Sequence, residues 1–340
     1  MSALPGGFFF VLALFVAQGA SAQASLRLER DEKGRTLTLL AGPVSLPANL
    51  GYDAPFVQLA VAGRWEIDGW LRAFEVDLVD REGAVIQERL LHHAGLIDPL
   101  ERDLFNPVAR RIVAFGMETE GIRLPGRLGY RVEPHDSVVL AGAFFNPTSE
   151  PFAEVFLRVR MVYADVRYDA RHQSVLPFYL DAAATGVTQF DVPPGMSEHS
   201  EEWHPAIGGR VLALGGHLHE GGVSVRLEDV SEATVLWIGT AEHDVSGALT
   251  GVSRSVFARG FRMEPAREYR ITATYDNRSE DVIVGAMGHV AGLFLPDDIE
   301  QMPPADRSHP AYLADLYGKI GGAGSRSHGS HGGHGRHASH

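Results

Sequence analysis

The stretch FAEVFLRVRMVYADV, residues 152–166, alternates apolar and polar side chains over most of its length. On a β-strand, successive side chains point to opposite faces, so its apolar members share one side while Arg158 and Arg160 share the other. The run YRITATYDN, residues 269–277, repeats the pattern with Tyr269, Ile271, Ala273 and Tyr275 in phase. A period of two with one apolar face predicts antiparallel strands that cover a core on one side.

Turn residues separate such runs along the chain, as at Asn146-Pro147, Pro193-Pro194-Gly195 and Gly221-Gly222. Many short strands with regular turns are typical of β-sandwiches and jelly rolls. Helical periodicity is scarce, and its best example is 310–320, closed by Gly321. We therefore expect an all-β protein of two tandem antiparallel, jelly-roll-like β-sandwiches with a short C-terminal helix and a disordered His-rich tail.

Composition shifts divide the chain into five expected segments. These are a signal peptide (1–22), an N-terminal sandwich (23–174), a C-terminal sandwich (175–298), a helical extension (299–322) and the His-rich tail (323–340). Phe8 to Ala17 is too short an apolar run to span a bilayer, and Ala20-Ser21-Ala22 is a small-x-small cleavage site. We expect an exported protein, periplasmic or extracellular, with no membrane span.

The charge and the missing cysteines restrict the partners. A formal net charge of -13 disfavours nucleic acid as a partner. The chain has no cysteine, which excludes disulfides and thiolate sites, whereas it has 16 histidines. Any metal would therefore be held by imidazole, thioether, carboxylate or backbone.

The segment RVLALGGHLHEGG, residues 210–222, contains an H-x-H pair. On a regular strand, His217 and His219 share a face with Val211 and Ala213, opposite the leucines. The pair could converge on one cation or lie as polar residues on the wet face of a sheet. The spacings of the cupin and metallo-β-lactamase motifs do not fit this segment.

Two other segments carry candidate ligands. His92 and His93 in LLHHAGL are adjacent, so they reach one metal only at a bend or bulge; otherwise one points inward and one outward. In VGAMGH, Met287 is either core filler or a thioether ligand that favours copper, with His289 as its competitor.

The tail GGAGSRSHGSHGGHGRHASH spaces histidines every third residue: His328, His331, His334, His337 and His340. This composition cannot bury a core, and a three-residue period would align the imidazoles in a polyproline II conformation. We expect metal binding or buffering by the tail, with purification-tag origin as the alternative.

The order of these motifs resembles the copper type II, ascorbate-dependent monooxygenase family of peptidylglycine α-hydroxylating and dopamine β-monooxygenases. LLHHAGL, FDVPPG, GGHLHEGG and VGAMG, scattered over residues 85–295, carry the resemblance. The GGH-x-H-x-GG form is closest to a less characterised branch that includes plant stress-upregulated proteins.

The resemblance implies two sandwiches, each holding one copper across a solvent-filled cleft. His217, His219 and Met287 would hold the copper that activates O2 for C–H hydroxylation, and His92 and His93 the copper that delivers an electron. The implied partners are O2, an external reductant such as ascorbate, and a small-molecule or peptide substrate. Ala143 stands where the family has a third histidine for the electron-transfer copper, and His135 could replace it only if its loop turned back.

Charged residues near these motifs are expected to be solvated. Asp98, Glu101 and Asp103 follow the HH pair, and an acidic cluster with His199 and His204 precedes the H-x-H strand; both are predicted to be surface loops. The sequence thus predicts an exported protein with one or two coppers. It is either a copper monooxygenase or a copper store, carrier or sensor without turnover; a structural β-sandwich is the third alternative.

Overall fold

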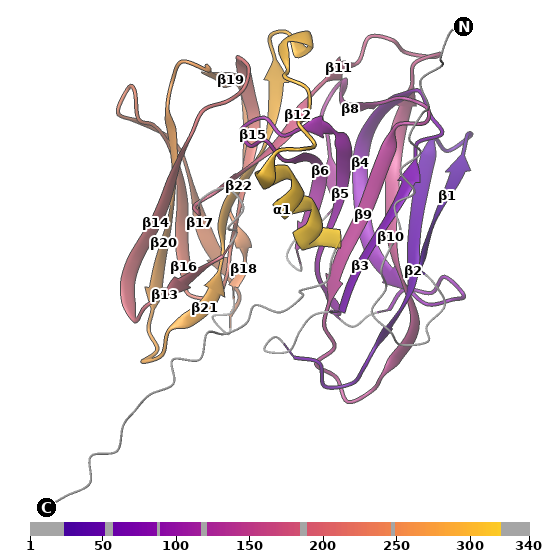
Figure 1. Cartoon of the computed structure of the whole chain (residues 1–340), viewed down its shortest axis with the longest axis horizontal. Helices are drawn as coiled ribbons and strands as arrows, with labels where there is room; N and C mark the ends of the chain where they lie inside the picture. Colours follow the sequence, from indigo (N-terminus) through magenta and orange to yellow (C-terminus); the bar gives the residue numbers. More distant parts are fainter. Residues whose placement is uncertain are drawn as a thin grey trace, which may run out of the picture.

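The computed structural model describes residues 24–51, 57–86, 89–116, 121–183, 189–245 and 249–320. The described chain is mostly β-strand with one short α-helix near its end, which confirms the predicted all-β class (Figure 1). The predicted signal peptide (1–22) and His-rich tail (323–340) lie outside the described residues.

The N-terminal half contains two sheets. The first is 7-stranded, in the order β1-β2-β10-β4-β8-β11 with β7 beside β4. Its strands are β1 (Ser25–Asp31), β2 (Thr36–Leu46), β10 (Phe152–Asp165), β4 (Gly69–Val79), β8 (Leu128–Val132), β11 (Gln173–Ser174) and β7 (Ile122–Arg123). The second sheet, in the order β3-β9-β5-β6, comprises β3 (Val57–Arg64), β9 (Ser137–Phe144), β5 (Leu91–Arg102) and β6 (Ala109–Gly116). All pairings are antiparallel except that of β11 with β8.

The C-terminal half repeats this arrangement. One sheet, in the order β12-β22-β15-β19, comprises β12 (Leu176–Asp181), β22 (Gly288–Pro296), β15 (Gly209–Leu218) and β19 (Ser255–Met263). The other, in the order β14-β20-β16-β17-β18, comprises β14 (Gly195–Trp203), β20 (Tyr269–Asn277), β16 (Gly222–Asp229), β17 (Thr234–His243) and β18 (Leu249–Val252). A short pair joins β13 (Phe190–Val192) to β21 (Ile283–Ala286).

Each half has its own apolar core, built by the strand faces that the sequence predicts. The in-phase residues of 155–163 are buried in the first core, and those of 269–275 in the second. Burying such side chains contributes roughly 1.5–3 kcal/mol each relative to leaving them exposed. The period-two prediction for these two strands is confirmed.

The two halves match strand for strand. The order β2-β10-β4-β8 corresponds to β12-β22-β15-β19, and β3-β9-β5-β6 to β14-β20-β16-β17. Arg-x-Glu-Pro precedes both β9 and β20, at 131–134 and 262–265. Asn146 and Asn277 then build the same loop: each Nδ2 donates to the carbonyl four residues on, and each Oδ1 accepts from the amide two residues on. The second half is therefore a structural repeat of the first.

Several contacts tie the described parts of the halves together. The loop after β5 inserts Leu104 and Phe105 into the second core, where the Leu104 carbonyl accepts from Ala206 N at 2.8 Å. Arg111 of β6 lies over the Tyr179 ring of β12, 5.5 Å from its centre. Arg111 also forms a 2.9 Å ion pair with Asp315 of helix α1 (Pro310–Ile320). The outer face of the β3-β9-β5-β6 sheet thus meets the outer face of the β12-β22-β15-β19 sheet.

The C-terminal extension returns to the first half. A 3-10 helix, η1 (Ile299–Gln301), precedes α1, whose bounds are those predicted from the sequence. Tyr312 is buried and donates its hydroxyl to Pro99 O at 2.7 Å. The helix therefore packs at the junction of the two halves (Figure 1).

Three local predictions are wrong. The acidic cluster before the H-x-H strand is not a loop but strand β14, whose side chains alternate between half-buried and exposed. Asp98 and Asp103 are buried rather than solvated, because β5 continues to Arg102 and its following loop enters the interface. Val211 faces the core with Leu214, since a bulge at Leu212 resets the alternation of β15.

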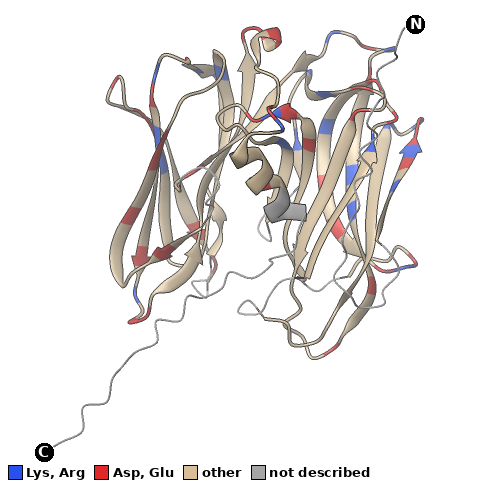
Figure 2. Ribbon diagram, in the orientation of Figure 1, with Lys and Arg blue, Asp and Glu red and all other residues tan. Residues whose placement is uncertain are grey.

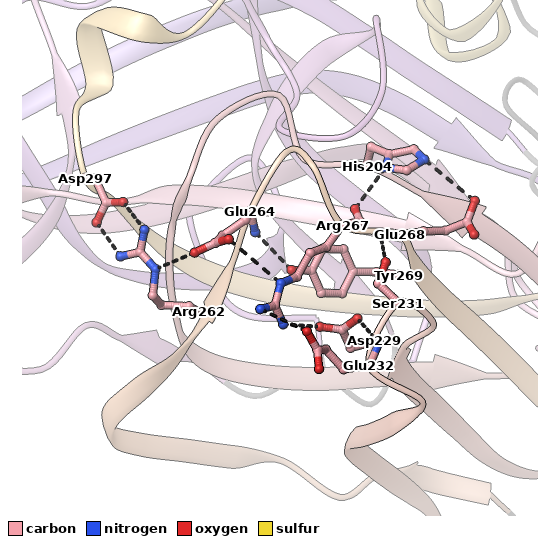
Figure 3. A network of polar contacts seen from close by, with 10 residues as sticks. All are labelled: His204, Asp229, Ser231, Glu232, Arg262, Glu264, Arg267, Glu268, Tyr269 and Asp297. Carbon is pink, nitrogen blue, oxygen red and sulfur yellow. Dashed lines mark hydrogen bonds and ion pairs between the residues drawn. The ribbon is translucent and has the colours of Figure 1, made fainter.

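Charged residues of both signs are spread over both halves (Figure 2). One network of ion pairs in the second half links Arg262 to Glu264 and Asp297, and Arg267 to the buried Asp229 and to Glu232 (Figure 3). His204 belongs to this network through Arg267 O, at 2.8 Å, and Glu268. His204 is thus an exposed histidine with a local structural role.

Candidate metal centre

His92 and His93 both reach the outer face of the first half because β5 bulges at His92. The β5–β9 register passes from Leu91 opposite Phe144 to His93 opposite Ala143, so His92 is the extra residue. A bulge suspends the alternation of side chains. The Nδ1 atoms of the two imidazoles lie 2.6 Å apart, with the rings edge to face at 88°. One ring therefore donates a hydrogen bond to the other, so the two imidazoles of the HH pair are held together.

His217 and His219 lie at the end of β15, on its outer face. Gly221, with φ of 83°, reverses the chain directly after them, and Gly222 N donates to His219 O at 2.9 Å. Gly216 must lack a side chain because a Cβ would lie 2.6 Å from Val225 in the core. The glycines on both sides of H-x-H thus fix where the two imidazoles stand.

Tyr275 holds the backbone beside His219. Its hydroxyl accepts from His219 N at 2.9 Å and donates to Met287 O. The hydroxyl therefore bridges two strands that have stopped pairing directly. Removal from water raises the pKa of Tyr275 to about 12, so it remains a donor.

The two histidine pairs meet at the junction between the halves. One nitrogen each of His93, His217 and His219 lies within 4.8 Å of the others. The His93 ring is centred 5.4 Å from that of His217, and the His217 ring 5.1 Å from that of His219. Imidazole nitrogens bind zinc-sized cations at about 2.0–2.1 Å, so small side-chain rotations would close this group around one ion.

The charge state suits a metal. Removal from water, and then the neighbouring His92, His217 and His219, hold the pKa of His93 well below its usual value. His93 is therefore neutral at pH 7 and retains a lone pair. Neutral imidazole is the form that binds metals.

This arrangement differs from the two separated coppers that the resemblance implies. His93 lies in the same group as His217 and His219, instead of across a solvent-filled cleft from them. Ala143 does stand opposite His93 on the next strand, but imidazoles from the other half occupy the space beside His93. His135 lies at the other end of β9, where its backbone bonds to Trp65 O and its φ is 74°. The loop does not turn back, so His135 is not brought to the site.

His289 and Met287 lie beside the group. The register pairs His217 with His289, whose rings are stacked with centres 5.0 Å apart. The His289 Nδ1 lies 2.6 Å from the Asp181 carboxylate of β12. Met287 directly precedes Gly288, which pairs with Leu218, and its carbonyl accepts from the Tyr275 hydroxyl that also accepts from His219 N. Ligation by the Met287 sulfur stays a prediction, and the tail histidines His328, His331, His334, His337 and His340 lie outside the described residues.

Sequence reasoning missed Asp181 and Tyr275 as parts of this site. Asp181 ends an apolar strand, and Tyr275 reads as a core residue, which it also is. Neither carries a local motif, because their roles depend on which strands become neighbours. The role of Asp181 becomes visible only in the β12–β22 register, which sets it opposite His289.

Comparisons with known proteins add nothing on function. No protein-family profile matches the chain, and no curated protein matches it. Among solved structures, PNGF-II aligns at 9% identity over 76% of this chain and 66% of its own, with a TM-score of 0.38. A structure of Sulfolobus Turreted Icosahedral Virus aligns at 8% identity over 84% of this chain and 97% of its own, with a TM-score of 0.37. These scores are too low to support an argument.

Within the described part of the chain, no helix is both long and apolar enough to cross a bilayer.

Proposed function

We propose that this protein binds one copper ion at the junction of its two halves, through His93, His217 and His219. The observation that carries the proposal is the convergence of three imidazole nitrogens, from β5 and from the end of β15, to within 4.8 Å. Chance surface histidines rarely approach one another so closely, since each would gain from full hydration. The bulge at His92 sets both imidazoles of the HH pair on the outer face, and the glycines around H-x-H fix the end of β15 beside them.

Copper is favoured by the donor set. Imidazole ligands suit copper, zinc, nickel and iron, and affinity among divalent ions peaks at copper. The group of three contains no carboxylate, which would favour harder cations. With the expected export signal, we propose a periplasmic or extracellular copper store, carrier or sensor.

Oxygen activation is the second candidate function. Three protein ligands leave part of a metal's coordination sphere open, which is the usual arrangement of a catalytic metal. The resemblance to copper monooxygenases points the same way. An external reductant such as ascorbate and an organic substrate would then be the partners.

The test counts copper on the full-length mature chain with the five tail histidines replaced by asparagine. We expect one tightly bound copper per chain, lost in His93→Ala and in His217→Ala and retained in His204→Ala. Zinc in excess should not displace it. A copper count unchanged in both site variants, or no tight copper, would refute the proposal. Oxygen consumption with ascorbate, present only in the copper-loaded parent, separates the catalytic candidate from the storage one.

A further inference from the structure

His289 is anchored by a carboxylate at the junction, yet it is not one of the three imidazoles that meet. Its Nδ1 lies 2.6 Å from the Asp181 carboxylate, and the two residues face each other across the β12–β22 register. Its ring lies at 12° to that of His217, with centres 5.0 Å apart. Asp181, His289 and His217 thus form one row across three neighbouring strands.

The row ends at a ligand of the proposed copper. We propose that Asp181 and His289 form a positioning pair, in which Asp181 fixes the His289 ring and that ring fixes the plane of His217. The inference rests on the proposed function and assigns His289 a role other than ligation.

Geometry distinguishes positioning from ligation. The Nδ1 of His289 is engaged by the Asp181 carboxylate at 2.6 Å, which leaves only its Nε2 for a metal. Within the described residues, the group of mutually close ligand atoms includes His217 and omits His289. A stacked aromatic neighbour, in turn, limits the broad rotation about χ2 that a histidine ring otherwise has.

The Asp181 carboxylate fixes the orientation of the His289 ring. A histidine that donates Nδ1–H to a carboxylate has its tautomer and its ring orientation fixed. In metal sites, removal of groups that orient a ligand typically costs about 10- to 100-fold in metal affinity. A ligand lost outright should cost more than that.

Four variants of the tail-substituted full-length chain test the assignment by copper affinity. His289→Ala removes the stacked ring and should weaken copper about 10- to 100-fold, as should Asp181→Ala, which frees it. Asp181→Asn still accepts from Nδ1 and should lose less. The double variant His289→Phe with Asp181→Asn keeps a stacked ring and removes the charge of the carboxylate that His289 engaged, and it should bind copper within a few-fold of the parent.

Pulsed EPR of the Cu(II) form supplies a readout that general destabilisation does not move. We expect the same number of coordinated imidazoles in the parent and in the phenylalanine double variant. A count that falls by one there, with copper affinity lost, would make His289 a ligand and overturn the inference. Unchanged affinity in His289→Ala would overturn it as well.

Should the variants not fold, nitrogen-15 histidine NMR of the parent with Cu(I) decides. The expected result is a metal-induced shift of the coordinating nitrogen of His217 without one at His289 Nε2; a shift at both overturns the inference. In every arm, a parent that binds no copper refutes the proposed function itself, whereas a copper-binding parent insensitive to these changes refutes the positioning pair alone.

Discussion

The two halves of the molecule use one equivalent position in different ways. In the first half, Arg158 of β10 faces Asp77 of β4 and pairs with it through two hydrogen bonds of 2.6 and 2.7 Å. In the second half, the corresponding strands β22 and β15 place His289 opposite His217. Both pairs lie on the outer face of the same sheet of the repeat.

The difference shows how a repeated scaffold acquires a site. An arginine and an aspartate satisfy each other's charges and hydrogen bonds, so the first half has nothing left to offer a ligand there. Imidazole nitrogens, unlike a guanidinium, can bind a metal. The second half also turns this face toward the other half, where His93 lies, whereas the first half turns it away. A metal site therefore needs both imidazole side chains and a position that faces the third imidazole.

The largest expected effect comes from transplanting the ion pair of the first half into the second. His217→Asp with His289→Arg should abolish tight copper binding, a loss beyond the roughly 100-fold that a positioning group costs. The fold should persist, because the scaffold already accepts this pair. Copper affinity measures the loss of binding, and the melting temperature of the metal-free chain shows whether the fold persists.

The reciprocal exchange, Asp77→His with Arg158→His, is the control. It should create no copper site, because the third imidazole of the proposed site comes from the facing half. Copper bound by the transplanted variant as tightly as by the parent would mean that His217 is not a ligand.

This contrast also explains what the sequence could predict. Alternation and turns are local, so they revealed the strands, the buried faces of 155–163 and 269–275, and helix α1. The H-x-H and HH pairs were visible as motifs for the same reason.

Their convergence was not predictable in the same way. It depends on a bulge at His92, on another at Leu212 and on the apposition of two sheets, none of which has a local signature. Asp181 is the extreme case, because it becomes relevant only through strands far away in the sequence.

The halves also differ in how they complete their cores. Phe105 of the first half is buried in the second core, while the described residues of the first core all come from the first half. Phe105→Ala should lower the free energy of unfolding by about 3–5 kcal/mol, as for other buried phenylalanines. Urea denaturation monitored by tryptophan fluorescence measures the loss.

Leu100→Ala, at a side chain that is 44% exposed, is the matched control and should change stability by less than about 0.5 kcal/mol. Equal effects of the two substitutions would contradict the described interface. A transition that splits into two in Phe105→Ala would show that this residue makes the halves unfold together.

The Asn146 and Asn277 loops should behave alike, as equivalent parts of the repeat. Each buried side chain amide donates to backbone carbonyls, from Asn146 to Pro47 O and from Asn277 to Val192 O. Substituting either by alanine leaves those acceptors unpaired and should cost about 1–3 kcal/mol. Denaturation of the two single variants gives the comparison.

The burial of Asn277 also bears on whether it can carry a glycan. Asn277-Arg278-Ser279 matches a glycosylation acceptor, but the Asn277 amide is enclosed and engaged. Intact mass after expression in a glycosylating host should show no glycan at Asn277. A glycan there, or a large difference between the two alanine variants, would break the equivalence of the loops.

The smallest expected effect is on the pH dependence of stability. It distinguishes the Arg158–Asp77 pair of the first half from the histidines at the junction. The pKa of Arg158 is raised by its hydrogen bonds to Asp77, so the cation of that pair persists throughout the neutral range. Removal from water instead lowers the pKa of His93 well below 6.5, and that of His289 is lowered too. As pH falls below 6.5, the unfolded chain binds protons at these residues that the folded chain does not.

The metal-free protein should therefore lose stability on acidification below that point, by at most about 1.4 kcal/mol per pH unit for each such histidine. Above it, these groups are neutral in both states and contribute no slope. Urea midpoints between about pH 7 and 5 measure the effect. His93→Gln should flatten the curve; equal slopes in the parent and in His93→Gln would mean that burial does not lower the pKa of His93.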